Sequence, residues 1–149
     1  MRTMIRRGVV LCMALALAAC GGDDDGGFNP TVDDVAGSYS ASAFTLTSGN
    51  SDFDLLAIGA SVTATLNADG TTTGRLQVPG GIGGAPAIDE DLAGTWSLSG
   101  TTVVFSPSAS SLLTDVDFAV GPGTLTGEGV YQGAVLQLVL TKANEGDRP

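Results

Sequence analysis

Few side chains in this sequence could carry out catalysis. The chain contains no histidine, which excludes the triads and metal sites that depend on an imidazole. Neither a Gly-x-Ser-x-Gly motif nor a phosphate-binding loop is present. Asp115 and Asp117 could act as a carboxylate pair, because they share one face of a predicted strand about 7 Å apart. Both should face water, so we expect no enzymatic activity.

Two acidic segments could bind calcium, which takes oxygen ligands. Residues 50–54 (NSDFD) resemble the first half of a calcium loop. However, Leu55 stands where the turn glycine belongs, and Ser61 stands where a closing glutamate belongs. Residues 89–91 (DED) form the second acidic cluster. Because solvated acidic runs are far commoner than sites, we predict no metal and no cofactor.

Cys20 is the side chain with the clearest predicted chemistry. The chain begins with three arginines (Arg2, Arg6 and Arg7), and residues 8–19 then carry no charge. This order is typical of a secretory signal, and the apolar run is shorter than the ~20 residues of a membrane-spanning helix. The run ends at Cys20, whose thiol is the strongest side-chain nucleophile near neutral pH.

Residues 17–20 (LAAC) resemble the lipobox of bacterial lipoproteins. The resemblance implies that the Cys20 thiol receives a diacylglycerol and that the signal peptide, residues 1–19, is removed. Cys20 would then carry two or three acyl chains such as palmitate and anchor the protein to a membrane. An ordinary signal peptide that contains a cysteine is one alternative, and a twin-arginine signal at Arg6 and Arg7 is the other.

The resemblance also predicts a location in the cell envelope. Gly21 and Gly22, rather than an aspartate, follow Cys20, which favours the outer membrane. All sixteen acidic residues but only three basic residues follow Cys20, so the mature net charge is −13. This charge repels phosphate and argues against a nucleic-acid partner. Residues 20–34 are acidic and glycine-rich and should form a flexible linker.

From Val35 onward, alternating apolar and polar residues predict β-strands rather than helices. Eight strands are expected, joined largely by tight turns such as Asp69-Gly70. Residues 54–58 could be a short helix or the start of a strand, and residues 79–91 should form a flap over one end. The expected strands are residues 37–46, 61–67, 73–78, 94–98, 101–105, 115–120, 124–131 and 134–140.

The apolar phase of the first expected strand shifts between Tyr39 and Phe44, which indicates a β-bulge. The number of strands predicts an all-β fold, an antiparallel up-and-down barrel. A two-sheet β-sandwich is the alternative. The predicted domain covers residues 35–143, and residues 144–149 should be a disordered tail.

Three motifs resemble small bacterial lipocalin-like proteins: VAGSYSA at residues 35–41, LNADGTTTGRL at 66–76 and DLAGTWSLSGTTVVFS at 91–106. The resemblance implies a barrel with an internal cavity for an apolar ligand. Small residues at expected inner positions, including Ala119 and Gly127, would leave room for it. The candidate cavity residues are Tyr39, Leu66, Leu76, Trp96, Phe105, Phe118 and Leu138.

The expected function is non-covalent binding of a small apolar or amphipathic molecule, lipid-like in character, by a protein anchored through the lipid on Cys20. The alternative is a structural or protein-interaction module of the envelope. In that case the same aromatic side chains would fill the barrel and leave no space for a ligand.

Overall fold

The computed structural model describes residues 27–81, 84–107, 112–113 and 116–144. The predicted signal peptide, Cys20, Asp115 and the tail beyond Asn144 lie outside the described residues. The elements are α1 (Val32–Val35), β1 (Gly37–Ser48), β2 (Ser51–Asp54), β3 (Ser61–Leu66), β4 (Thr71–Val78), β5 (Ile88–Asp91), β6 (Gly94–Ser99), β7 (Thr102–Pro107), β8 (Asp117–Gly121), β9 (Thr124–Tyr131) and β10 (Ala134–Lys142). No helix among these residues has the length and hydropathy needed to cross a membrane.

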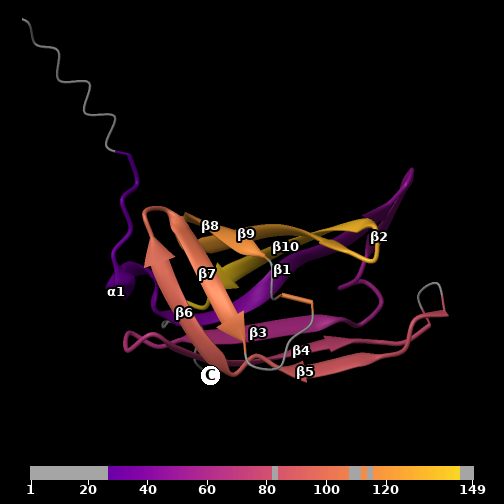
Figure 1. Cartoon of the computed structure of the whole chain (residues 1–149), viewed down its shortest axis with the longest axis horizontal. Helices are drawn as coiled ribbons and strands as arrows, with labels where there is room; N and C mark the ends of the chain where they lie inside the picture. Colours follow the sequence, from indigo (N-terminus) through magenta and orange to yellow (C-terminus); the bar gives the residue numbers. More distant parts are fainter. Residues whose placement is uncertain (1–26, 82–83, 108–111, 114–115, 145–149) are drawn as a thin grey trace, which may run out of the picture.

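Eight of the strands form a closed antiparallel barrel, in the order β1, β3, β4, β6, β7, β8, β9 and β10 (Figure 1). The barrel closes where β10 pairs with β1, from Tyr39 opposite Lys142 to Thr47 opposite Val135. The prediction of an all-β up-and-down barrel is therefore confirmed. The alternative, a two-sheet sandwich, is wrong because one continuous set of pairings runs around the whole structure.

The predicted irregularity in β1 is also confirmed. The register between β1 and β10 shifts between Ala41 and Ala43, so that Ser42 is the extra residue of a bulge. Its hydroxyl accepts a hydrogen bond from the Thr141 side chain at 2.8 Å. A bulge bends the strand and increases its twist, which helps this long strand to follow the curve of the barrel.

Two short strands lie outside the barrel and were not predicted. β2 pairs with the second half of β1, and β5 pairs with the second half of β4. The expected flap at residues 79–91 therefore ends in a strand. Residues 54–58 are neither a helix nor a strand start, because β2 ends at Asp54 and a turn follows. All four residues of β2 are exposed, so this strand lacks the alternation that reveals the others.

The two ends of the barrel differ. Helix α1 precedes β1 and lies at the end that also holds the β3–β4, β6–β7 and β8–β9 turns (Figure 1). Val35 is buried there and its carbonyl accepts a 2.6 Å hydrogen bond from the Tyr39 hydroxyl. Burial raises the pKa of Tyr39. Because strands alternate in direction, the β1–β2, β4–β5 and β9–β10 hairpins project from the opposite end.

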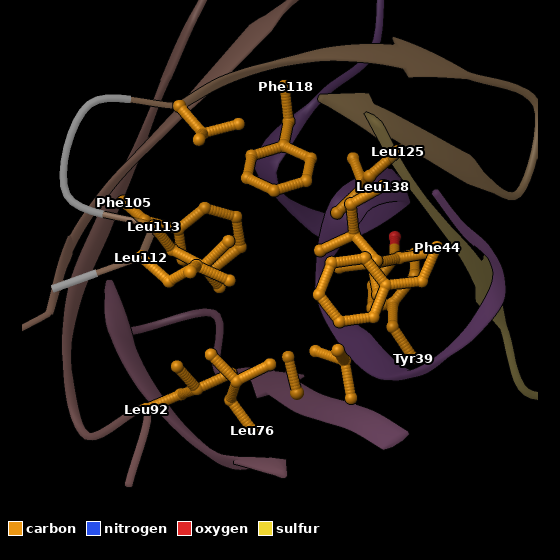
Figure 2. Packing of buried hydrophobic residues seen from close by; sticks show 14 of the residues in the cluster. Tyr39, Phe44, Leu76, Leu92, Phe105, Leu112, Leu113, Phe118, Leu125 and Leu138 are labelled. Carbon is orange, nitrogen blue, oxygen red and sulfur yellow. The ribbon is translucent and has the colours of Figure 1, made fainter. Parts of the chain in front are cut away.

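The interior between these ends is filled with apolar side chains (Figure 2). Phe44, Phe118 and Leu138 are completely buried. The rings of Phe105 and Phe118 meet edge to face, with their centroids 5.0 Å apart. This geometry is a favoured one for aromatic pairs, and it packs the neighbouring strands β7 and β8 together on the core side.

Small residues in the wall do not leave the room expected from the sequence. A Cβ atom added at Gly127 would lie 2.6 Å from Cε1 of Phe118 and 2.6 Å from Cγ1 of Val116. The ring of Phe118 thus occupies the position that a side chain at residue 127 would take. Ala119 faces solvent rather than the interior, since its neighbour Phe118 points inward.

We therefore expect Gly127→Ala to destabilise the barrel by about 1–3 kcal/mol, because an added methyl group overpacks the core. Urea unfolding measures the free energy change. The exposed neighbour Thr126 provides the control, as Thr126→Ala should cost less than about 1 kcal/mol. Wild-type stability in Gly127→Ala would contradict the packing described here.

Candidate binding cleft

A cleft of about 550 Å³ lies at the hairpin end of the barrel. Three hairpins and Leu112, from the β7–β8 connection, form its walls. The lining residues are Leu46, Ser48, Phe53 and Leu55 from the β1–β2 side, Val78, Pro79, Gly84, Ala85, Pro86 and Ile88 from the β4–β5 side, Tyr131, Gln132, Ala134 and Leu136 from β9–β10, and Leu112.

The lining is apolar with a few neutral polar groups. Ser48, Tyr131 and Gln132 contribute its polar side-chain atoms, and among the described residues no charged side chain belongs to it. The Tyr131 hydroxyl accepts a hydrogen bond from the Gln132 amide at 3.2 Å. A concave, apolar surface with a small number of polar groups is typical of small-molecule sites.

The register of β1 explains how the first wall forms. Leu46 lies opposite Leu136 on β10 and opposite Phe53 on β2. Residues directly opposite each other point to the same face of a sheet, so these three side chains form one row toward the cleft. Phe53 remains 45% exposed. It therefore offers apolar surface that a ligand could cover.

Asp54 holds the turn that ends this wall. Its Oδ1 atom accepts hydrogen bonds from the backbone amides of Leu56 at 3.0 Å and Ala57 at 3.2 Å. The amide of Leu55 donates to the carbonyl of Phe44 at 2.8 Å. These bonds place the Leu55 side chain at the base of the cleft, where it is buried.

An ion pair on the outer face supports the β4–β5 wall. The Arg75 guanidinium donates from Nε and Nη2 to the two carboxylate oxygens of Asp89, at 2.8 and 2.7 Å. These hydrogen bonds hold the pKa of Asp89 below its usual value. On the opposite face of the hairpin, Val78 pairs with Ile88 and both line the cleft.

The seven predicted cavity residues come together in the core and not in the cleft. All seven are buried, and none of them lines the cleft. Phe105 and Phe118 border a gap of about 10 Å³, which is about the smallest space that holds one water. Trp96 lies at the α1 end, where its Nε1 donates to the Asn67 carbonyl at 2.8 Å.

Sequence reasoning did not identify the cleft residues. Many of them belong to residues 46–55 and 78–88, which lack regular alternation and include β2 and the first residue of β5. The available signal was the segment PGGIGGAPAI at residues 79–88. Its small apolar residues carry no charge, which is unusual for a solvent-exposed connection.

The acidic candidates that the structure describes are exposed or hydrogen-bonded and do not converge on a site. Asp117 is exposed on the outer face of β8, and Asp115 lies outside the described residues. Asp52 accepts a hydrogen bond from the Thr47 hydroxyl at 2.7 Å, while Asp54 caps its turn. In the part of the chain that the structure describes, no group of three or more Cys, Asp or Glu residues could hold a metal ion.

No known protein family matches the chain, and no similar curated protein or solved structure was found. The closed eight-stranded barrel is consistent with the fold that the resemblance to lipocalins implies. The three sequence motifs remain the basis of that resemblance.

The support of the β4–β5 wall can be tested by titration. We expect Arg75→Gln to raise the pKa of Asp89 toward its ordinary value, because the two guanidinium hydrogen bonds are lost. Because the pKa of Asp89 is lowered in the folded state, the ion pair contributes to the free energy of unfolding above the unfolded pKa of about 3.9. This contribution is lost as the pH falls through the folded-state pKa. Carboxyl-carbon NMR measures the shift.

Lys142→Gln is the matched control, because it removes one positive charge at the α1 end and should leave the Asp89 titration unchanged. An Asp89 titration that is the same in wild type and Arg75→Gln would show that this ion pair does not form in solution.

Proposed function

We propose that this protein binds a small apolar or amphipathic molecule, lipid-like in character, in the cleft at the hairpin end of the barrel. The observation that carries the proposal is an apolar cleft of about 550 Å³. This volume lies within the range of about 300–1,000 Å³ that is usual for ligand sites. The absence of histidine favours a binding function over catalysis.

The lining provides enough apolar surface for useful affinity. Each 100 Å² of apolar surface that the lining and the ligand together remove from water contributes about 2.5 kcal/mol, before the cost of immobilising the ligand is subtracted. Leu46, Leu136 and Phe53 form a continuous apolar row for such contact. The neutral side chains of Ser48 and Gln132 can bond to a polar end.

We further propose that the chain is anchored to the outer membrane through lipid on Cys20. The linker enters the barrel through α1, whose four residues form the last part of the predicted linker and the start of the domain. Because α1 lies at the end opposite the hairpins (Figure 1), the linker joins the end away from the cleft. An anchor attached at that end would leave the cleft facing the aqueous side.

A second candidate function is a protein-interaction module. The filled interior favours it, because the barrel itself has no room for a ligand. Apolar side chains exposed at the hairpin end, including Phe53, Val130 and Val135, could also contact a protein. The cleft favours the small-molecule proposal, since protein interfaces tend to be flatter than ligand sites.

Binding can be tested with the neutral fluorescent dye N-phenyl-naphthylamine. The protein is the chain from residue 20 with Cys20→Ser, which removes the proposed lipid and alters no described residue. We expect Phe53→Ser to weaken dye binding about tenfold, since burying a phenyl ring contributes about 1.5–3 kcal/mol. Dye titration measures the affinity.

Val130→Ser is the matched control. Val130 is 77% exposed and lies opposite Val135 on the outer face of the same barrel end, so its loss should leave the affinity unchanged. If the parent chain gives no saturable dye signal, the ligand-binding proposal fails.

The anchor can be tested by mass spectrometry of the protein purified from membranes of its own cells. We expect an N-terminal peptide that begins at Cys20 and carries diacylglycerol, and we expect Cys20→Ser to remain unprocessed and unlipidated. An unacylated Cys20 in the mature wild-type protein would contradict membrane anchoring.

A further inference from the structure

We infer that the cleft selects amphiphiles whose polar end is uncharged or cationic, and that it discriminates against anionic ones such as fatty-acid carboxylates. The inference rests on the proposed binding function and specifies the class of ligand. It follows from where the positive and negative charges of the described residues lie.

The basic side chains of the described residues are Arg75 and Lys142, and both are engaged away from the cleft. Arg75 lies on the outer face of β4, where it is bound to Asp89 and 4.0 Å from Asp91. Lys142 Nζ donates to the backbone carbonyl of Asp34 at 2.9 Å, at the α1 end. Neither residue lines the cleft, so a bound anion would find no positive partner there within the described part of the chain.

The polar groups of the lining are neutral. Ser48, Tyr131 and Gln132 can donate and accept hydrogen bonds to an alcohol, an amide or an amine. A carboxylate would exchange its hydration for an apolar surface without a countercharge, which is strongly unfavourable. The lining therefore accepts an uncharged polar end and opposes a negative one.

Two carboxylates without a positive partner among the described residues lie beside the cleft, on the β1–β2 wall. Asp52 and Asp54 flank Phe53 on β2, and both are held in place by the hydrogen bonds to Thr47, Leu56 and Ala57. Asp89 on β5 points to the outer face, where Arg75 neutralises its charge. Charges within a Debye length of about 8–10 Å act on a ligand through the solvent. Asp52 and Asp54 therefore oppose an anion and favour a cation beside the β1–β2 wall.

Two dyes with closely related ring systems test the inference. N-phenyl-naphthylamine is neutral, whereas anilinonaphthalene sulfonate carries a negative charge. With the Cys20→Ser chain from residue 20, we expect the sulfonate to bind at least about tenfold more weakly. Decyltrimethylammonium and decanol should displace the neutral dye at about pH 8, and decanoate should require at least about tenfold higher concentration.

A variant with an added positive charge shows whether the charge or the shape of the cleft causes the discrimination between the two dyes. Ser48 is exposed and lines the cleft, so Ser48→Lys places an ammonium group beside a bound ligand. We expect Ser48→Lys to bring the affinities for the two dyes within about threefold of each other. Ser48→Gln, of similar reach but neutral, should keep the difference found in the parent chain.

The outcomes distinguish the two proposals. Failure of the neutral dye to bind would overturn the proposed function itself. Equal binding of both dyes to the parent chain would overturn the inference on ligand charge and leave the binding proposal intact. A sulfonate affinity that remains low in Ser48→Lys would attribute the discrimination to shape, and would likewise overturn the inference.

Discussion

The pairing of β1 with β10 is the constraint on which the rest of the structure depends. It joins the first strand of the barrel to the last one across about a hundred residues of sequence, and it closes the sheet so that the barrel has an inside and an outside. Every alternating strand then places its apolar residues in the interior. The bulge at Ser42 lets β1 follow this curve while it remains paired on both sides of the irregularity.

The cleft results from a change of partners along β1 and β4. At the α1 end, β1 pairs with β3 and β4 pairs with β6. Toward the hairpin end, β2 takes over the edge of β1 and β5 takes over the edge of β4. The barrel wall therefore separates into hairpins at one end only. The apolar faces of these hairpins have no barrel interior to fill, and the space between them is the cleft.

The barrel could be predicted because its strands alternate and its turns carry specific residues. Gln132 and Gly133, with φ values of 50° and 82°, form the tight turn that the sequence indicates between β9 and β10. The cleft could not be predicted in the same way. Alternation shows that Phe118 and Leu138 point inward, but it does not show that Phe118 fills the space beside Gly127. Packing density, which decides between a cavity and a core, depends on contacts between distant strands.

The two short strands that frame the cleft also pose a hazard to a folded sheet protein. Among the described strands, β2 and β5 each pair along one edge only, so the other edge could recruit a strand from a second molecule. Each of them carries two aspartates, Asp52 and Asp54 on β2, and Asp89 and Asp91 on β5. Charged side chains on a short edge strand oppose such pairing. The same carboxylates therefore protect the protein from aggregating through the strands that open its barrel.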